Sequence, residues 1–425
     1  MNTERLDAFL RADFVGSLEW NRTTQRGTFT YDDGYRSGAD PTPLSLSMPI
    51  TAARHRGKVI AAYLWGLLPD NDAVLERWAR QFQVSLSNPM GLLASVGADL
   101  PGAVSIVEPG VGLDPAADGV EWLTDAEVEA QLAQVRKDHT AWLGPDGRWS
   151  LAGAQAKIAL LERDGRWGRP CGGVATNRIL KPAIAGLIDH DVNEHLCMAA
   201  ARDLGMRAAR TRVMTFGSER AIVIDRFDRT LGADGKTDLR FHQEDMCQAL
   251  GVHPGSKYQS DGGPSPVDVI GVLRDHVDAK HADHDINIFV DALIFSWLVA
   301  APDAHAKNYS LLLNGGGVRL APLYDIASAL PYDDFHPPKV KVAMKIGGYY
   351  KLASIGTSAW RRFAVEAGLE PDLVIDRARY LTEHAPAAFT AAARALDDPS
   401  DAMSARLVDR VTSRAAECRT QLGSR

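Results

Sequence analysis

Hydrophobic and polar positions follow different periods in the two halves of this chain. Near the start, short apolar runs at residues 14–20 and 27–31 alternate with turn signals, a pattern typical of strands. Further on, an almost unbroken apolar run at residues 288–301 predicts a buried helix. Amphipathic helices are then expected at residues 360–366, 372–383, 387–396 and 403–422. The pattern favours an α+β protein whose helices concentrate toward the C-terminus.

The stretch between these regions mixes both kinds of element. Thr124-Asp-Ala-Glu127 is a capping box, which predicts a helix that runs to about Lys137. Residues 109–119, rich in Gly, Pro, Asp and Ala, are the best candidate for a linker. The other predicted elements are helices at 72–83, within 91–107 (with a strand) and at 189–204, and strands at 158–160, 178–181, 210–214 and 221–224.

Composition and charge narrow the class of protein. The 425 residues predict two or three cooperating units. A net charge of −7 argues against a protein that mainly coats nucleic acid. The start lacks the pattern of a signal peptide and no uncharged apolar run reaches membrane-spanning length, so we expect a cytoplasmic protein that does not bind membranes. The four cysteines lie far apart without a Cys-x-x-Cys pair, which disfavours a disulfide framework or a zinc site.

A polar cluster follows the apolar run abruptly. Asp303 and Asn308 stand five residues apart, the spacing found in the catalytic loop of protein kinases, where an Asp takes the hydroxyl proton and an Asn holds a metal ion. Asp325 lies seventeen residues after Asn308, where such a fold would bring a Mg²⁺-binding Asp on a strand. Oxygen ligands of this kind suit Mg²⁺ bridged to phosphates. The alternative is an ordinary polar helix end.

A second candidate site lies upstream. After a turn expected at residues 144–147, small residues flank Gly153, and such a loop lets backbone N–H groups approach a phosphate, although a plain hairpin would look the same. Lys181 ends a short strand about thirty residues later, which matches the order of loop and lysine in a kinase, although a solvated lysine is common at a strand end. Glu194 on the next helix could pair with Lys181, with a surface position as the commoner outcome.

With these pieces in order, the chain resembles the HipA family of bacterial toxin Ser/Thr kinases over nearly its whole length. The segments that carry the resemblance are Pro43-Leu-Ser-Leu-Ser-Met-Pro49, Leu67-Leu-Pro-Asp-Asn71, Ser150-Leu-Ala-Gly-Ala-Gln-Ala-Lys157, Ile179-Leu-Lys-Pro182, Asn193-Glu194, Asp225-Arg-Phe-Asp-Arg229, His242-Gln-Glu-Asp-Met-Cys-Gln-Ala-Leu-Gly251, Lys257-Tyr-Gln-Ser-Asp-Gly-Gly-Pro-Ser265, Asp303-Ala-His-Ala-Lys-Asn308 and Pro322-Leu-Tyr-Asp-Ile-Ala-Ser-Ala-Leu-Pro331.

The resemblance implies an α+β, two-lobed protein-kinase-like fold with a small β-rich N-terminal module and a mostly helical C-terminal lobe. We expect the module at residues 1–108, a linker at 109–122, the small lobe with the phosphate loop at 123–230 and the large lobe with the catalytic and metal-binding residues at 231–425. ATP and Mg²⁺ are the implied cofactors. Asp303 would be the catalytic base, and Asn308 and Asp325 would bind the metal. The implied nucleotide-binding residues are Ala152, Gly153, Ala154, Gln155, Ala156, Lys157, Lys181, Asp225, Arg226, Phe227, His305, Lys307, Asn308, Tyr324 and Asp325.

The resemblance also implies partners and a form of regulation. A small helix-turn-helix antitoxin, HipB, would neutralise the kinase and link it indirectly to DNA, and the protein substrate would be an aminoacyl-tRNA synthetase. Ser150 matches a serine that is autophosphorylated in the family. Two positions depart from the family pattern, since Ala156 replaces a Glu and Ala304 replaces a Gly, and the first could alter how the loop is anchored.

Other polar stretches allow simpler readings. Residues 280–285 crowd metal-like residue types, but flanking charge and the lack of a second cluster favour a solvated loop. Residues 255–265 are expected to be a surface loop that leads into a helix from residue 267, and 339–345 a half-exposed strand. Two other functions stay open: a small-molecule kinase, and a nucleotide-binding protein that acts chiefly as a corepressor beside the antitoxin.

Overall fold

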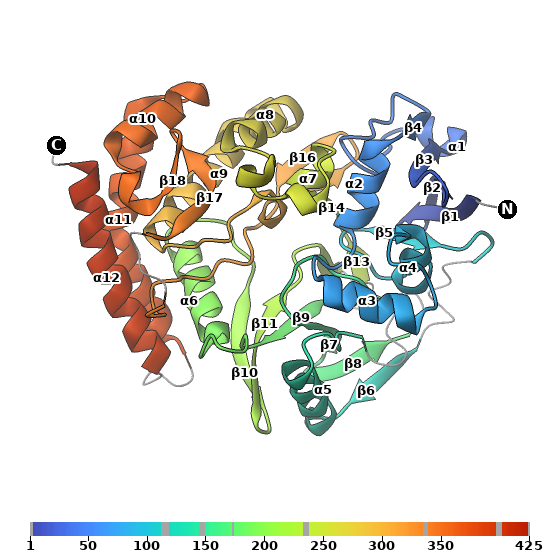
Figure 1. The fold of residues 1–425 in the computed structure, drawn as a ribbon, viewed down its shortest axis with the longest axis horizontal. Coiled ribbons are helices and arrows are strands. Elements are labelled where there is room, and N and C mark those ends of the chain that lie inside the picture. Colours follow the sequence, from blue (N-terminus) through green and yellow to red (C-terminus); the bar gives the residue numbers. More distant parts are fainter. Residues whose placement is uncertain are drawn as a thin grey trace. The chain divides into compact units, whose positions relative to one another are not determined.

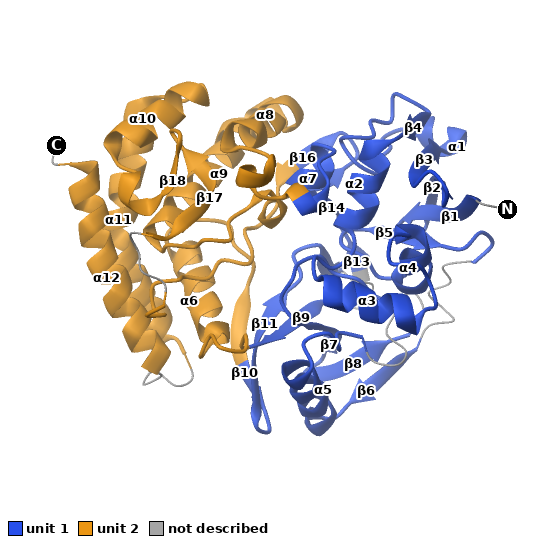
Figure 2. Ribbon diagram, viewed as in Figure 1, with its two compact units in different colours: residues 1–182, 214–255, 311–318 blue, residues 183–213, 256–310, 319–425 orange. Residues whose placement is uncertain are grey.

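The computed structural model describes residues 3–111, 119–143, 149–171, 174–232, 238–334, 339–396 and 402–423. The chain divides into two compact units (Figures 1 and 2). Unit 1 comprises residues 1–182, 214–255 and 311–318, and unit 2 comprises 183–213, 256–310 and 319–425. Residues 112–118 of the predicted linker, and the predicted turn at 144–147, lie outside the described residues. The predicted boundaries of module, linker and lobes stay a prediction.

Unit 1 begins with an antiparallel five-stranded sheet in the order β4-β3-β2-β1-β5. Alternate positions of its strands are buried, and Trp20 and Phe29 meet side chains of the covering helices such as Trp78 in one apolar core. The predicted strands at 14–20 and 27–31 are confirmed. The elements are β1 (Thr3–Leu10), β2 (Asp13–Asn21), β3 (Arg26–Tyr31), β4 (Arg54–Arg56), β5 (Val104–Val107), α1 (Asp33–Arg36), α2 (Lys58–Gly66), α3 (Asp72–Gln81) and α4 (Pro89–Val96).

A second sheet, of six strands, has the order β10-β11-β9-β7-β8-β6. The helix α5 (Asp125–Lys137) begins at the predicted capping box, where Thr124 and Glu127 bond reciprocally. Its apolar side packs on the sheet through Val128, Leu132 and Val135. The strands are β6 (Val120–Leu123), β7 (Ile158–Arg163), β8 (Arg166–Pro170), β9 (Arg178–Pro182), β10 (Thr211–Phe216), whose residues from Met214 belong to unit 1, and β11 (Glu219–Asp225).

A buried glutamate lies in the last part of unit 1. Glu244 accepts hydrogen bonds from Ser45 Oγ at 2.5 Å and from the backbone N–H of Leu46 at 2.7 Å. Burial raises the pKa of Glu244 to about 8. The elements here are β12 (Arg229–Leu231), β13 (Asp238–Arg240), β14 (His242–Asp245) and α7 (Met246–Ala249), with residues 311–318 of β15 (Ser310–Asn314) and β16 (Gly317–Leu320).

Unit 2 is mostly helical, as the sequence predicts. Its central helix α9 (Ala279–Leu298) buries Phe289, Phe295 and Trp297, and α11 and α12 lie side by side (Figure 1). The other elements are α6 (His190–Asp203), α8 (Pro266–His276), α10 (Thr357–Glu366), α11 (Pro371–Arg394), α12 (Ala402–Leu422), the hairpin of β17 (Lys341–Ile346) and β18 (Tyr349–Lys351), and the short 3-10 turns Gln259–Asp261, Ala306–Asn308 and Leu352–Ser354.

Two predictions for unit 2 are wrong. Residues 280–285 are not a solvated loop, because they form the first turns of α9, and Asp285 is fully buried against Arg319, with N···O distances of 2.9 and 2.8 Å. The two helices predicted at 372–383 and 387–396 are one helix, α11, with Pro386 inside it. A proline removes the N–H that would bond to the carbonyl four residues earlier. Here the Thr382 carbonyl accepts a hydrogen bond from Arg419 Nη1 of α12 at 3.1 Å instead.

Within the described ranges, no helix combines the length and the apolar character that crossing a membrane requires.

Candidate active site

The predicted catalytic stretch forms a tight turn after α9. The chain leaves that helix through Ala300, whose φ of 52° is left-handed, and Ala301 N–H bonds back to the Ser296 carbonyl at 2.8 Å. The Asp303 carbonyl then accepts two hydrogen bonds, from His305 N–H at 2.8 Å and from Asn308 Nδ2 at 2.7 Å. The amide of Asn308 thereby fixes the turn that carries Asp303, whose side chain is 59 % exposed.

Asp325 lies beside this turn through its neighbour Tyr324. The Tyr324 hydroxyl donates to the Lys307 carbonyl at 2.6 Å and lies 2.7 Å from Ser310 Oγ. Asp325 is not on a strand as predicted, because β16 ends at Leu320. Its φ of 59° puts Asp325 in the left-handed region, where non-glycine residues are strained. Residues with such strained backbones are enriched at functional sites. The structure therefore brings together the Asp303 turn and the Tyr324-Asp325 segment.

These residues can be tested for their fit to Mg²⁺. Because Asn308 uses Nδ2 for the Asp303 carbonyl, its Oδ1 is the remaining ligand atom, and Asp325 adds a carboxylate. Both are oxygen ligands of the kind that Mg²⁺ prefers. Across the described residues no cluster of three or more His, Cys, Asp or Glu side chains is arranged for a metal ion. A metal ion held here would thus rely on phosphate and water oxygens for its other ligands, which is usual for Mg²⁺ in phosphoryl transfer.

Two residues of the turn, His305 and Lys307, are buried, and the contact of Tyr258 with Asp303 was not predicted. His305 and Lys307 have relative exposures of 3 and 4 %. The Tyr258 hydroxyl donates to Asp303 Oδ1, and its ring lies edge-on to the His305 ring, with centroids 4.8 Å apart. Tyr258 belongs to one of the segments that carry the family resemblance, but the sequence pattern of residues 255–265 predicts only a surface loop.

The candidate phosphate loop lies in unit 1 and has no regular structure between Leu151 and Lys157. Gly153 has φ of 103°, a region that favours glycine. A Cβ placed there would lie 2.9 Å from Lys157 Nζ. Lys157 is buried, donates to the Ala152 carbonyl at 2.8 Å and lies 4.4 Å from the centre of the Trp142 ring. In this conformation the lysine closes the loop on itself.

The N-terminal part of unit 1 holds this loop in place. Asp70 N–H bonds to the Gly153 carbonyl at 3.0 Å, and Asn71 Nδ2 bonds to the Ala154 carbonyl at 3.1 Å. Ser150 is fully buried, and its hydroxyl donates to the Leu67 carbonyl at 2.7 Å. The quoted segment at 67–71 is therefore a support for the loop, a role that its sequence alone did not suggest.

The end of the loop continues into the sheet. Gln155 Nε2 lies 3.4 Å from the Pro182 carbonyl at the end of β9. Ala156, which departs from the family pattern, packs against the two apolar cores of unit 1. Both interactions fix the path of the loop beside β9.

Lys181 and Glu194 are both buried, with relative exposures of 6 and 1 %. Lys181 lies on β9, paired with Ile222 of β11. The solvated strand-end lysine and the surface glutamate, the commoner outcomes for such residues, are therefore wrong. Charged groups are rarely buried without a partner, so both positions point to a specific role.

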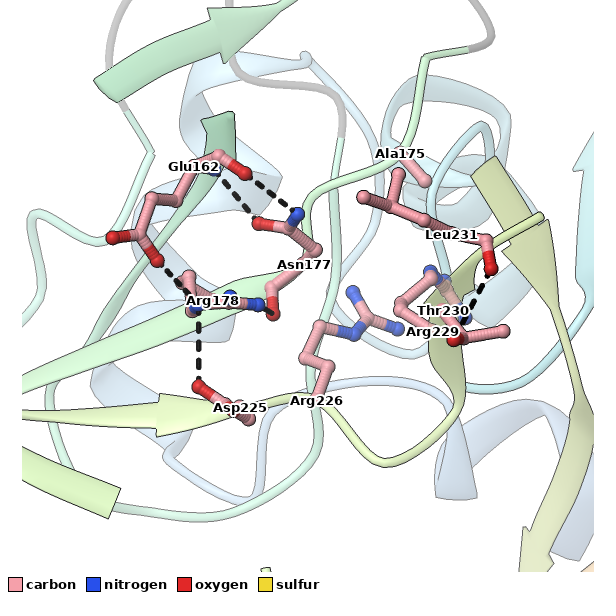
Figure 3. Close-up of a pocket in the computed structure, with 9 residues that line it drawn as sticks. All are labelled: Glu162, Ala175, Asn177, Arg178, Asp225, Arg226, Arg229, Thr230 and Leu231. Atoms are coloured by element: carbon pink, nitrogen blue, oxygen red, sulfur yellow. Dashed lines mark hydrogen bonds and ion pairs between the residues drawn. The ribbon is translucent and has the colours of Figure 1, made fainter. Parts of the chain in front are cut away.

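The segment from Asp225 to Arg229 borders a cavity and also contributes to a buried ion-pair network. Arg178 bridges the carboxylates of Glu162 and Asp225, at 2.6 and 3.2 Å (Figure 3). These three residues border a cavity of about 320 Å³. Arg226 N–H bonds to the Asn177 carbonyl at 3.1 Å, so this N–H is not available to a nucleotide. The other residues that line the cavity are Ala175, Asn177, Arg226, Arg229, Thr230 and Leu231.

The remaining charges of that segment form a buried ion-pair network. Arg226 Nη2 lies 2.8 Å from Asp228 and Nη1 3.5 Å from Asp99. Arg229 lies 2.9 Å from both carboxylates. Burial disfavours the charged form of Asp99, but Arg226 and Arg229 outweigh it and lower the pKa of Asp99. Arg226, expected as a nucleotide ligand, thus places its side chain in a structural network, which the sequence did not reveal.

Family models and known proteins match this chain over most of its length. The model of the HipA-like C-terminal domain matches residues 149–389, and that of the HipA N-terminal domain matches residues 6–107. The protein Y4mE of Sinorhizobium fredii is 35 % identical over 406 residues, which cover 94 % of each chain. This chain belongs to the HipA family.

Other members of the HipA family agree over similar lengths. The serine/threonine-protein kinase toxin HipA of Shewanella oneidensis is 28 % identical over 403 residues, covering 91 % of this chain and 89 % of that protein. A solved structure of Shewanella oneidensis HipA with HipB and its operator DNA superimposes with a TM-score of 0.83 at 26 % identity, covering 97 % of each chain. The predicted α+β, kinase-like HipA fold is confirmed.

Proposed function

We propose that this member of the HipA family is an ATP- and Mg²⁺-dependent serine/threonine protein kinase. The observation that carries the proposal is the exposed Asp303 carboxylate on a turn braced by Asn308, with Tyr324 binding the adjacent carbonyl so that Asp325 follows close by. A base, an amide oxygen and a second carboxylate in one place are the parts that phosphoryl transfer needs.

The proposed roles follow from the chemistry of each group. Asp303 accepts the proton of a substrate hydroxyl as that oxygen bonds to the γ-phosphorus of ATP, and ADP leaves with the electrons of the broken P–O bond. Mg²⁺, held by Asn308 Oδ1 and Asp325, would offset the negative charge of the phosphates. His305 and Lys307 line the phosphate site, and Lys181 reaches the α/β-phosphates. Ala152, Gly153, Ala154, Gln155, Ala156 and Lys157 cover the phosphates, and Asp225 and Phe227 offer backbone groups to adenine.

We also propose that the kinase is the toxin of a toxin–antitoxin pair. The support is the similarity to the HipA of the HipA–HipB–operator complex, which extends over 97 % of each chain. The antitoxin would be a HipB-like helix-turn-helix protein, and the substrate a translation factor such as an aminoacyl-tRNA synthetase. Phosphoproteomics after brief expression tests this: the intact chain should arrest growth and phosphorylate a translation factor. An Asp303→Ala control should do neither, and equal growth of both at equal protein level would overturn the toxin assignment.

Autophosphorylation at Ser150 would switch the kinase off. Ser150 is fully buried and bonded to the Leu67 carbonyl, so the loop must leave its support before the hydroxyl can react. A phosphate there carries between about −1.5 and −2 charges near pH 7 and no longer fits the buried position. Intact-mass spectrometry after incubation with Mg·ATP should show one added phosphate that is absent from Ser150→Ala and Asp303→Ala. A phosphate that persists in Ser150→Ala would contradict this.

A further inference from the structure

Tyr258 touches the proposed base but has no part in the roles given so far. Its hydroxyl donates to Asp303 Oδ1, and His305 Nε2 lies 3.7 Å from the same oxygen. Among the described residues, none forms a hydrogen bond with Asp303 Oδ2. The two oxygens of the carboxylate are therefore not equivalent: Oδ1 is held by the protein, and Oδ2 remains for a substrate hydroxyl.

The segment that carries Tyr258 is fixed on both sides. The Tyr258 carbonyl accepts hydrogen bonds from Asp261 and Gly263 N–H, both at 3.0 Å, which closes a compact turn. A Cβ at Gly263 would lie 2.1 Å from the Ser256 carbonyl oxygen, so the turn requires glycine there. Gln259 Oε1 accepts from Lys345 N–H of β17 at 2.6 Å. The phenol thus approaches Asp303 from a backbone that has little freedom to move.

We propose that Tyr258 is a positioning residue for phosphoryl transfer, which holds Asp303 Oδ1 so that Oδ2 faces the acceptor hydroxyl. This inference rests on the proposed function. An aspartate on an exposed turn has two free torsions, and rate depends steeply on the orientation of the base. A charge-assisted hydrogen bond from a fixed phenol selects one rotamer. The packing of the phenol ring on His305 keeps the donor aligned.

The opposite role is chemically conceivable and predicts the opposite result. The Tyr258 hydroxyl could occupy the place of the substrate hydroxyl, in which case removing it would speed the reaction. The fixed backbone around residues 256–263 and the second, unbonded oxygen favour the positioning role, because a competitor has to move away before a substrate can bind.

The test is Tyr258→Phe, which removes one oxygen and keeps the ring. Initial rates are measured with the acceptor protein found by phosphoproteomics, with Mg·ATP and acceptor varied in turn. We expect kcat to fall about tenfold, the usual weight of a hydrogen bond to a charged group, while both KM values and the calorimetric affinity for Mg·ATP stay within twofold. Tyr349→Phe is the matched control, because Tyr349 is an exposed tyrosine of the same unit that does not bond to Asp303; it should match the wild type.

Gln259→Ala serves as a second variant. It removes the bond to Lys345 N–H that anchors the segment, but leaves the phenol itself. A smaller fall in kcat, about threefold, with unchanged KM values is expected.

Each outcome decides between specific alternatives. If the wild type transfers phosphate and Asp303→Asn does not, yet Tyr258→Phe equals the wild type, the positioning role is wrong and the kinase assignment stands. A higher kcat for Tyr258→Phe shows that the phenol competes with the substrate, which also overturns the positioning role. If the wild type transfers no phosphate to any protein, the proposed function itself fails and the inference fails with it.

Discussion

Asp228 and Asp303 both lie in segments that the sequence analysis gives as functional, yet the surroundings of the two carboxylates differ sharply. Asp99 and Asp228 have side-chain exposures of 6 and 5 % and lie between the guanidinium groups of Arg226 and Arg229. Asp303 has a side-chain exposure of 59 %, with a phenol and an imidazole as neighbours. Full compensation by cations suits a structural role, whereas a base must keep an oxygen open to its substrate.

The contrast suggests how such motifs can be read. Both segments combine acidic and basic residues at short spacing, and composition alone treats them alike. What separates them is the partner of each carboxylate, which depends on residues far away in the sequence, such as Asp99 for Arg229. A charged motif therefore predicts that its charges need partners. Only the fold shows whether those partners are other residues of the protein or a ligand.

The sharpest way to break this comparison is Asp303→Asn. Loss of the base should lower phosphoryl transfer by on the order of 10³-fold, measured as initial rates with labelled ATP. Because the Asp303 side chain is 59 % exposed, the midpoint of thermal unfolding should change by no more than about 2 °C. If the Asp303→Asn variant is destabilised, or if it transfers phosphate normally, Asp303 has a structural role like that of Asp99 and Asp228.

The converse experiment is Arg226→Met. This substitution keeps a long side chain but removes one of the guanidinium groups that compensate the negative charges of Asp99 and Asp228. Breaking a buried pair should cost roughly 3–5 kcal/mol of unfolding free energy, measured from urea midpoints. The matched control is Arg178→Met, whose bridge to Glu162 and Asp225 is only partly buried; it should cost about 1 kcal/mol. Equal costs for the two variants would contradict the view that burial sets the weight of the network.

Glu244 offers an intermediate case, a buried carboxyl bound by neutral donors. Its folded pKa of about 8 exceeds the ordinary value of 4.5, so the folded state binds more protons between these values. Its contribution to stability is therefore fully present below pH 4.5 and is lost as the pH rises toward 8. Glu244→Gln should flatten this part of the stability–pH curve and stabilise the protein by about 1–3 kcal/mol at pH 8 relative to the wild type. Urea unfolding at pH 5.5 and 8 measures both; parallel curves would show that the glutamate is ionised when folded.

The smallest effect is expected at the support of the phosphate loop. Asn71 caps α3 through Ala73 and Val74 N–H and also bonds to the Ala154 carbonyl, so Asn71→Ala should cost about 1 kcal/mol and weaken Mg·ATP binding severalfold. Asn21 makes similar bonds to Thr23 and Thr24 N–H without touching the loop, so Asn21→Ala should lose stability only. Calorimetry measures the affinity of both variants for Mg·ATP. Equal affinities would contradict the proposal that Asn71 supports the phosphate loop.

Local patterns predicted much of the fold because they depend on neighbours in the sequence. The capping box at Thr124 and the buried run in α9 are examples, and both are confirmed. Long-range partners caused the errors: Asp285 is buried because Arg319 meets it, and α11 continues because Arg419 reaches Thr382. Within the candidate site, the spacing of Asp303 and Asn308 was enough to predict that they act together. The contact of Tyr258 with Asp303 could be found only from the fold, since the two residues lie forty-five positions apart in the sequence.

The proline inside α11 also has a consequence for the order in which the protein is made. Synthesis completes α11 before Arg419 has been added to the chain, and until then the Thr382 carbonyl has no helix N–H to bond and must bind water. Before Arg419 bonds to the Thr382 carbonyl, we expect α11 to bend at Pro386, because the sequence pattern predicts two separate helices there. The following helix, α12, then supplies the guanidinium that bonds to the Thr382 carbonyl, so α11 is completed by the helix it packs against.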